Sequence, residues 1–580
     1  MSEKLQKLEL TWPGKDERFN PEPRILLEDT SKSYSKEPTE EGSVKPTFDN
    51  MLIHGDNLLA LKALEQDYTG KFKCIYIDPP YNTGRAFEHY DDGLEHSIWL
   101  SLMRDRLEIL WKLLTPDGLM AIQIDDNEFA RLFVLLCEIC GQQNLKTICV
   151  KMSEASGLKM GAVKKSGTIP KLKEYIILAK RNGINNLKLP LIPKEKWDNE
   201  YNIFLENFTR EDKNFIDQIN SKEKIEKEDL VQLNILSKGI KQVSVSQKIR
   251  ELNVKDKEAW CFENAYRICR TTASDTVFKL VEQEKHNYNQ EFFFVISKKG
   301  DSIYFAKSSY ALTSSRPRVQ IIFAEDNLSQ HPGDLWTDIK TTGLDNEGGV
   351  DFKKSKKPEA LIQRIVNMNT EPGDLVLDSF LGSGTTCAVA HKMGRKWIGI
   401  EMGDHAYTLC IPRLTKVING EDQGGITRAT GWKNGGGFKF YELASSLIVK
   451  DRYGQQVISD KYNADMLAEA MCKILDYHYQ PDKEKYWKQG FSSEKSFIYT
   501  TTMSMQETSL SALAEEVGDN NLLICCSAFR GNTNAYPNIS VKKIPAAILK
   551  KCEWGATGYP FQLKDYQPKN EDFEFDEEEG

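Results

Sequence analysis

Four consecutive residues, Asp78-Pro79-Pro80-Tyr81, have types that could do chemistry on a planar amino group. The two prolines fix φ and remove two amide donors, so the Asp78 carboxylate and the Pro79 carbonyl can converge as hydrogen-bond acceptors. Two acceptors on the amino hydrogens favour a pyramidal amine and expose its lone pair. Tyr81 adds a flat apolar face on which a base can stack. The alternative is a rigid corner at a strand end, in which Asp78 caps the next segment.

The stretch "GDLVLDSFLGSGTTCAVAHKMGRKWIGIEM" has the pattern of a ligand-binding turn between two strands. One strand ends at Asp378, the turn holds Gly382 and Gly384, and a helix starts near Thr385. The second strand ends on Glu401, close to the ~20-residue spacing of nucleotide-binding α/β units. Glycine admits a ligand close to the backbone, the helix start presents free N–H groups, and the acid can accept both hydroxyls of a ribose. The same glycines also fit a tight turn with close helix packing.

Two departures from common nucleotide motifs narrow the ligand class. Cys387 stands where the dinucleotide fingerprint has its third glycine, and the chain has no Gly-Lys-Ser/Thr loop. Both disfavour phosphate-rich ligands, including the cofactor of an NAD-dependent oxidoreductase. A ligand with a ribose and no phosphate fits better, and S-adenosylmethionine is the common one. Its sulfonium methyl, held in line with an exposed amine lone pair, would need little beyond placement.

The expected secondary structure would bring both stretches to one edge of a sheet. From about residue 50, strand-like segments ("MLIHGD", "FKCIYID", "LMAIQID") alternate with helix-like ones ("NLLALKALEQDYTG", "SIWLSLMRDRLEILWKLLTPDG", "NEFARLFVLLCEICG"). The alternation stops after about 145 and returns over residues 351–402. This pattern predicts a parallel sheet, and open α/β sheets bind ligands at the carboxyl ends of their strands.

We therefore expect an α/β fold: a Rossmann-like, S-adenosylmethionine-dependent methyltransferase domain with a mixed, mostly parallel sheet, interrupted by an insert, plus an α+β C-terminal region. The expected divisions are an N-terminal arm (1–48), the first part of the methyltransferase domain with the catalytic motif (49–145), the insert (146–335), the second part with the cofactor motif (336–435), a C-terminal domain (436–570) and an acidic tail (571–580).

Composition and charge are consistent with a globular protein that meets phosphates locally. The 580 residues are 40% hydrophobic and 28% charged, so two or three domains are expected. A formal net charge of -8 argues against a uniformly basic nucleic-acid binder, but residues 146–196 hold twelve Lys or Arg against three Asp or Glu. A local basic face could therefore contact a phosphate backbone. The last ten residues hold seven acids, which predicts a solvated tail.

The sequence also predicts a cytoplasmic protein with no membrane segment and no metal. The start, "MSEKLQKLEL", lacks a signal pattern, and no apolar run approaches the ~20 residues of a membrane span. The twelve cysteines are scattered. The one Cys-x-x-Cys pair, Cys137 and Cys140, lies in an apolar segment of helical periodicity and lacks the second pair that a zinc site would need. Core packing is the expected role of these two residues.

These motifs resemble those of amino-methyltransferases that act on DNA. "DPPY" resembles their catalytic motif in the form that adenine-N6 enzymes favour, and "DSFLGSGTT" resembles their S-adenosylmethionine motif; the catalytic motif comes first, as in the group called beta. With "HGDNLLALKAL", "ENAYRICRTTASDTV" and "KKPEALIQRI", the chain resembles the modification subunit of type III restriction systems. The resemblance implies a site-specific transfer of methyl to N6 of an adenine flipped out of double-stranded DNA. It further implies a homodimer and a helicase-nuclease restriction subunit as partner.

Site residues follow from the same resemblance. Asp78, Pro79, Pro80 and Tyr81 would hold the flipped adenine. The implied cofactor-binding residues are Asp56, Lys357, Pro358, Asp378, Phe380, Gly382, Gly384, Thr385 and Glu401. Relatives carry a His-Glu-Tyr-Ile step before a strand; here Lys173 replaces the histidine, and we assign that step no role.

The insert would be the target-recognition domain. The candidate phosphate contacts in it are Lys159, Lys164, Lys165, Lys171 and Lys173, and the candidate base or backbone contacts are Lys241, Gln247, Lys248, Arg250, Arg267 and Arg270. Two alternatives stay open: a cytosine-N4 methyltransferase, and a DNA-recognition subunit that acts mainly within a nuclease or helicase assembly. The region beyond 435, which catalysis does not obviously need, motivates the second.

Overall fold

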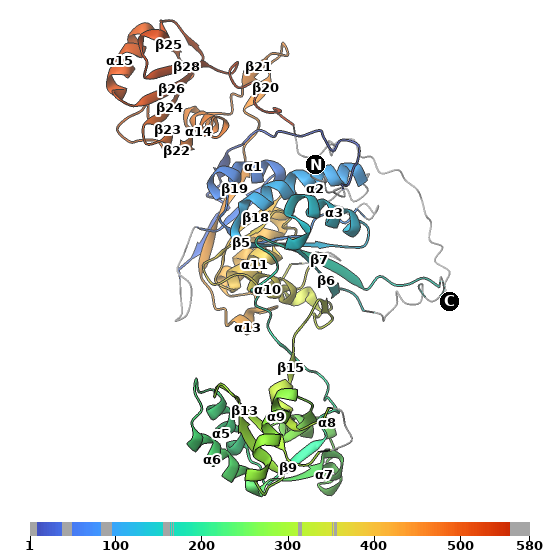
Figure 1. The fold of residues 1–580 in the computed structure, drawn as a ribbon. Coiled ribbons are helices and arrows are strands. Elements are labelled where there is room, and N and C mark those ends of the chain that lie inside the picture. The colour runs from blue at the N-terminus through green and yellow to red at the C-terminus, as the bar shows by residue number, and fades with distance from the viewer. Residues whose placement is uncertain are drawn as a thin grey trace, which may run out of the picture. The chain divides into compact units, whose positions relative to one another are not determined.

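The structure is a computed structural model that describes residues 9–37, 49–82, 96–154, 163, 165, 167–310, 316–350, 352 and 356–556. The chain divides into two compact units, and Pro190–Pro332 forms the smaller one (Figure 1). The acidic tail lies outside the described residues. Among the residues that are described, no helix combines the length and apolar character that crossing a bilayer demands.

One mixed sheet organises the larger unit, in the order β1-β19-β3-β18-β17-β4-β5-β7-β6-β16, with β2 also paired to β19. The six neighbours from β19 to β5 run parallel, whereas β7 is antiparallel to both β5 and β6. The strands are β1 (Leu26–Glu28), β2 (Tyr34–Lys36), β3 (Met51–His54), β4 (Phe72–Ile77), β5 (Leu114–Ile124), β6 (Leu145–Lys151), β7 (Lys173–Lys180), β16 (Leu335–Trp336), β17 (Leu375–Asp378), β18 (Lys396–Glu401) and β19 (Gly436–Leu443). The predicted α/β class with a mostly parallel sheet is confirmed.

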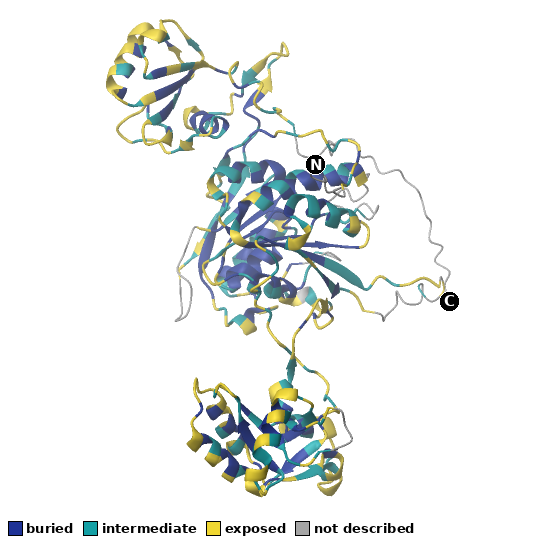
Figure 2. Cartoon of the chain, in the orientation of Figure 1, coloured by how far each residue is buried: buried dark blue, intermediate teal, exposed yellow. Residues whose placement is uncertain are grey.

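Helices cover both faces of this sheet. They are α1 (Asn57–Tyr68), α2 (His96–Leu113), α3 (Phe129–Cys140), α10 (Glu359–Asn367), α11 (Thr385–Lys392), α12 (Ile411–Asn419) and α13 (Thr427–Thr430). Successive residues of a strand point to opposite faces. On β4, Ile75 and Ile77 pack in one core with α1, α2 and α3, and Cys74 and Tyr76 pack in another with α10, α11 and α12. The strands are therefore buried on both sides (Figure 2).

Two predicted boundaries differ from the structure. The second helix ends at Leu113, before its predicted end, and the chain continues directly into β5. Pro116, which has no backbone donor, falls in the stretch where the β4–β5 register shifts. The predicted insert also begins too early for the compact unit, which starts at Pro190, because β6 and β7 precede that residue and pair into the main sheet.

The smaller unit has its own sheet and core. Its six strands follow the order β10-β9-β11-β14-β13-β12 and pair antiparallel. They are β9 (Ile203–Glu206), β10 (Lys241–Ser244), β11 (Ile268–Thr272), β12 (Phe292–Ile296), β13 (Ile303–Lys307) and β14 (Gln320–Phe323), with α5 (Arg210–Asn220), α6 (Lys227–Leu236), α7 (Val245–Glu251), α8 (Lys257–Glu263) and α9 (Asp275–Glu284). The short β8 (Ile192–Pro193) pairs with β15 (Ser329–Gln330) where the chain enters and leaves this unit.

The C-terminal region, predicted as α+β, forms a separate five-stranded sheet of the larger unit. Its order is β22-β23-β24-β26-β28, from β22 (His478–Tyr479), β23 (Gly490–Ser493), β24 (Ser496–Thr500), β26 (Asn521–Cys526) and β28 (Ile539–Lys543). The helices α14 (Ala464–Ile474) and α15 (Glu507–Val517) contribute to the two cores around it, and the pairs β20 (Ile448–Lys450) with β21 (Gln456–Ile458) and β25 (Ser504–Met505) with β27 (Ala528–Phe529) stand beside it.

A fully buried ion cluster joins the helices below the glycine turn. The Glu359 carboxylate of α10 lies 2.8 Å from Lys392 Nζ of α11 and 2.8 Å from Arg413 Nη2 of α12. Lys392 also lies 2.6 Å from Asp422, and Arg413 donates to Thr385 Oγ1 at 2.7 Å. All four charged side chains are at most 1% exposed. The cluster therefore fixes the start of α11 to the start of α10.

We predict that Glu359→Ala destabilises the protein by about 3–5 kcal/mol, because two fully buried cations, Lys392 and Arg413, lose the carboxylate that they share. Chemical denaturation monitored by Trp fluorescence measures this loss. Glu371→Ala, which removes a 61%-exposed carboxylate paired with Lys188, is the matched control and should stay within about 0.5 kcal/mol. Equal effects of the two variants would contradict a structural role for the cluster.

Candidate active site

Three acidic residues lie at the carboxyl ends of three adjacent parallel strands. β17 pairs with β4 on one side, through Leu377 opposite Ile75, and with β18 on the other, through Asp378 opposite Gly399. Asp78 directly follows β4, Asp378 ends β17 and Glu401 ends β18. The catalytic and cofactor motifs, far apart in the sequence, therefore meet at one edge of the sheet.

The glycine turn is organised around two carboxylates. Asp378 accepts from the Phe380 amide at 2.9 Å and from the Thr386 hydroxyl at 2.5 Å. Glu401 accepts from the Gly382 amide at 2.7 Å and from the Gly403 amide at 2.9 Å. Gly382 has a φ of 57° and Gly384 a φ of 80°, a region that side chains disfavour. The turn is thus held to the Glu401 carboxylate by its own backbone.

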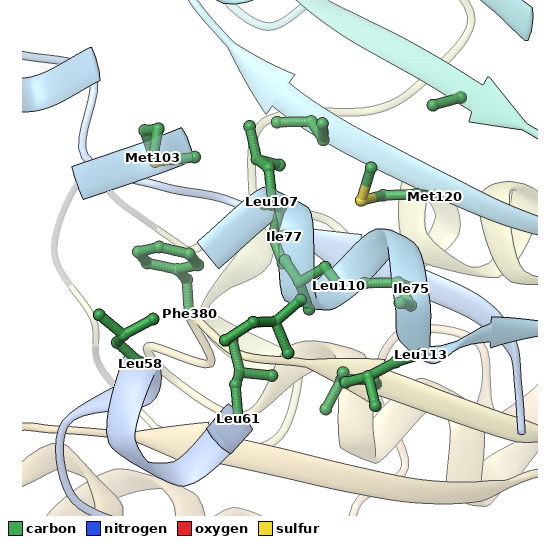
Figure 3. Close-up of a cluster of buried hydrophobic side chains, with 14 of the residues drawn as sticks. Leu58, Leu61, Ile75, Ile77, Met103, Leu107, Leu110, Leu113, Met120 and Phe380 are labelled. Atoms are coloured by element: carbon green, nitrogen blue, oxygen red, sulfur yellow. The ribbon is translucent and has the colours of Figure 1, made fainter. Parts of the chain in front are cut away.

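The other predicted cofactor residues have structural partners around this turn. Phe380 points into the core between α1 and α2, beside Leu58 and Leu61 (Figure 3). Asp56 caps α1 by accepting from the Leu59 amide at 3.0 Å, and Pro358 immediately precedes α10. The ring of Phe352 would lie 3.7 Å from a Cβ placed on Gly382, so it stands against the outer side of the turn.

The catalytic motif forms a compact, hydrogen-bonded corner after β4. The Tyr81 hydroxyl donates to Asp78 Oδ1 at 2.7 Å, and the Trp99 indole donates to the Pro80 carbonyl at 2.9 Å. Pro79 is buried. Among the described residues, the Asp78 carboxylate contacts the side chains of Tyr81 and Lys357.

Lys357 and Glu174 complete this corner. Lys357 Nζ lies 2.7 Å from the Tyr81 hydroxyl, 3.2 Å from Asp78 Oδ2 and 3.2 Å from Glu174 Oε2. Lys357 thus contacts the catalytic motif, whereas the sequence predicts it beside the cofactor. Glu174 belongs to the segment Lys-Glu-Tyr-Ile, residues 173–176, for which the sequence predicts no role. Lys173 beside it pairs with Asp126. Only the pairing of β7 reveals where Glu174 lies.

Burial and charge set the protonation of this group. Burial raises the pKa of Asp78, the Lys357 ammonium opposes that rise, and the Glu174 charge adds to it. Burial would also raise the pKa of Glu174, but Lys357 and hydrogen bonds from Gln123 and Tyr81 bring it below its usual range. Burial acts to lower the pKa of Lys357, and the two carboxylates together raise it. Glu174 and Lys357 are therefore charged at neutral pH.

A second acid missed by the sequence analysis braces the chain on both sides of residues 83–95, which lie outside the described part. Glu128 is fully buried and accepts from Asn82 Nδ2 at 2.7 Å. It also contacts His96 Nδ1, at the start of α2. Asn82 has a φ of 56°, so the backbone turns sharply directly after Tyr81. The sequence carries a signal for this acid in "IDDNEF", a run of acids at the end of the predicted strand "LMAIQID".

The predicted DNA contacts fall in both units, and Lys159 and Lys164 lie outside the described residues. In the larger unit Lys165 is exposed, Lys171 pairs with Asp125, and Lys173 pairs with Asp126. The smaller unit carries the others on β10, on α7, on β11 and directly before β11: Lys241, Gln247, Lys248, Arg250, Arg267 and Arg270. Lys248 and Arg270 pair with Glu206 and Glu200, and Arg267 lies over the Phe204 ring at 4.7 Å.

Fold and site together define an α/β protein in which the Asp78 corner and the glycine turn lie at one edge of a parallel sheet. Residues 72–411 match the DNA methylase family of N6 and N4 methyltransferases, and the chain belongs to that family.

Among curated proteins, it is 35% identical over 446 residues to the probable type III restriction-modification enzyme HindVI Mod subunit of Haemophilus influenzae, covering 73% of this chain and 58% of that protein. It is 29% identical over 435 residues to the EcoPI Mod subunit of Escherichia phage P1, covering 67% and 61%. The predicted resemblance to type III modification subunits is confirmed. The chain spans about three fifths of the length of these two relatives.

Solved structures give lower similarity. The complex of M1.HpyAVI with SAM is 14% identical, with a TM-score of 0.29 and coverage of 63% of this chain and 98% of that one. The cytosine-N4-specific PvuII DNA methyltransferase is 15% identical, with a TM-score of 0.31 and coverage of 64% and 89%.

We predict that Asp378→Asn changes how stability depends on pH. Burial raises the pKa of Asp378 from 3.8 to about 7, so the folded protein holds this proton more firmly than the unfolded chain. That advantage is present at low pH and is lost as pH rises toward 7, by at most about 1.4 kcal/mol per pH unit. Asparagine carries no such proton. The difference in thermal midpoint between variant and wild type should therefore rise in favour of the variant from pH 5 to pH 8.

The exposed Asp519→Asn is the control and should show a constant difference over the same range. A constant difference for Asp378→Asn as well would mean that this carboxyl titrates normally.

Proposed function

We propose that this chain is a DNA methyltransferase that transfers the methyl group of S-adenosylmethionine to N6 of an adenine flipped out of double-stranded DNA. The observation that carries the proposal is the adjacency of β4, β17 and β18, which sets Asp78 beside Asp378 and Glu401. An amine acceptor and a ribose acceptor at one sheet edge suit transfer between a base and a nucleoside cofactor. The relatives named Mod subunits support adenine as the base and a type III modification role.

The cofactor fits the residues around the glycine turn. Both oxygens of Glu401 already accept one amide each, and each carboxylate oxygen has a further lone pair for a ribose hydroxyl. The left-handed backbone at Gly382 leaves its outer side free of a side chain, and Phe352 supplies an apolar surface there. S-adenosylmethionine would supply an electrophilic methyl group at this edge.

The chain's part in the transfer is placement. Asp78 accepts a hydrogen bond from the target amine, Pro79 fixes the backbone of the corner, and Tyr81 supports the base by stacking. Extrusion of the base costs about a few kcal/mol, which stacking and hydrogen bonds in the pocket offset. The Lys357 ammonium opposes the rise that burial causes in the Asp78 pKa, and so favours the ionised carboxylate, which is the better acceptor.

The smaller unit is proposed to recognise the DNA target, with the basic residues of β10, α7 and β11 facing it. We further propose that the chain dimerises. A restriction subunit is also proposed to associate with it, because the curated relatives are named as subunits of type III restriction-modification enzymes. Size-exclusion chromatography with light scattering tests the first point. Co-purification of a helicase-nuclease partner from the native cell tests the second.

We predict that Asp78→Ala lowers methyl transfer at least about a hundredfold, roughly 2.7 kcal/mol of barrier, and leaves cofactor affinity within about twofold. Transfer is measured with radiolabelled S-adenosylmethionine on DNA from a methylation-deficient host, and affinity by calorimetry. Mass analysis of the nucleosides identifies the product, expected as N6-methyladenine. If methylcytosine is the sole product, the enzyme belongs to the cytosine-N4 class instead. An Asp78→Ala rate within tenfold of wild type would contradict the role proposed for Asp78.

We predict that Lys241→Ala combined with Arg250→Ala weakens DNA binding and reduces the slope of log K against log salt by about 2, since each phosphate contact contributes about 0.9. Fluorescence anisotropy over a salt series measures the slope. The matched control is Lys298→Ala with Lys299→Ala, two exposed lysines between β12 and β13, at the opposite edge of the same sheet. A slope unchanged in the first pair would place the DNA elsewhere.

A further inference from the structure

A chain of hydrogen bonds crosses three neighbouring strands and ends at the Tyr81 hydroxyl. Tyr76 of β4 donates to Gln123 Oε1 of β5 at 2.6 Å, and Gln123 Nε2 donates to Glu174 Oε2 of β7 at 2.5 Å. Because β7 runs antiparallel to β5, the first residues of β7 lie at the carboxyl edge of the parallel strands. Glu174 Oε2 therefore reaches the Tyr81 hydroxyl, 2.8 Å away.

The Tyr81 hydroxyl has more acceptors than protons. It lies 2.7 Å from Asp78 Oδ1 and 2.8 Å from Glu174 Oε2, and Lys357 Nζ donates to it at 2.7 Å. A phenol carries a single proton. With Lys357 donating, that proton serves either Asp78 or Glu174. The corner thus offers the hydroxyl two alternative acceptors at nearly equal distance.

Methyl transfer would make use of both. Under the proposed function, on which this inference rests, the target amine takes the Asp78 carboxylate as its acceptor. The amine then competes with the Tyr81 hydroxyl for Asp78, and a half-buried hydroxyl displaced from its acceptor would lose up to about 1–3 kcal/mol. Glu174 removes that cost, because it already stands within hydrogen-bond distance.

We propose that Glu174 is a positioning residue for the transfer: when the target amino group binds Asp78, the Tyr81 hydroxyl donates to Glu174 instead, and the tyrosine ring stays in place under the base.

The surroundings of Glu174 suit this task. Gln123 accepts a hydrogen bond from Tyr76 and donates one to the Glu174 carboxylate, which holds that carboxylate in position. Lys357 balances its charge. The pKa of Glu174 lies below its usual range, so the group remains an acceptor at neutral pH. Within the part of the chain that the structure describes, the charged or titratable groups that interact with it are Tyr76, Asp78, Tyr81 and Lys357. Because Lys357 is shared by two carboxylates, the corner keeps an acceptor for an incoming donor.

A double-mutant cycle tests the role through Tyr81. Glu174→Leu keeps similar volume without an acceptor, Glu174→Gln keeps an acceptor oxygen, and Tyr81→Phe removes the hydroxyl. We expect Glu174→Leu to lower the single-turnover rate at least about tenfold, Glu174→Gln to stay within about threefold, and cofactor affinity to be unchanged in both. In the Tyr81→Phe background, Glu174→Leu should have no further effect. Losses that multiply in the double variant, or a Glu174→Leu rate within twofold of wild type, would overturn the proposal.

A structure of the wild-type protein with target DNA and a non-reactive cofactor analogue tests the same point without relying on a variant that folds. The Tyr81 hydroxyl is expected about 2.8 Å from Glu174 and out of hydrogen-bond range of Asp78. A hydroxyl still bonded to Asp78, or a ring turned away from the base, would overturn the inference. If wild-type protein methylates no amino group in DNA, the proposed function fails, whereas an active wild type with either contrary result leaves that function intact and removes only the role of Glu174.

Discussion

The parallel pairing of β17 with β4 is the constraint on which the site depends. It joins the strand before the amino-group corner to the strand before the glycine turn, although the whole smaller unit lies between them in sequence. The entropic cost of closing such a loop grows only with the logarithm of its length. Because residues 190–332 have their own sheet and core, they can be inserted without taking apolar surface from the main unit.

The larger unit has two charge clusters that differ in their exposure and in the ratio of cations to carboxylates. Around Glu359, two cations meet two carboxylates in a site without exposure, and the cluster joins α10, α11 and α12. Beside Tyr81, the Lys357 ammonium meets the carboxylates of Asp78 and Glu174, which keep 22% and 17% of their side chains exposed. An excess of acceptors that water can reach suits a site awaiting a hydrogen-bond donor.

The local alternation of strands and helices was enough to predict the parallel sheet and the place of the motifs. It could not predict which residues strand pairing brings into the site. Asp78, Gly382 and Glu401 each follow a short apolar strand, so their place at the sheet edge could be inferred from alternation alone. Glu174 and Gln123 depend on how β7 pairs with β5, and a slip of one residue would reverse the face of each side chain. Each of β6 and β7 also contains two lysines, so both sheet strands were hidden within a basic stretch, and the predicted insert boundary was placed too early.

The cysteine at the third-glycine position has a packing explanation. In the dinucleotide fingerprint, that glycine lets the helix approach the strand closely. Here the space is made on the strand: a Cβ on Gly399 of β18 would lie 2.7 Å from Cys387 Sγ and 2.6 Å from the Leu381 side chain. The close helix–strand contact is therefore kept with the small residue on the other side. Cys387 thus says little about phosphate, and the distinction from an oxidoreductase rests on the corner at Asp78 and on the family to which the chain belongs.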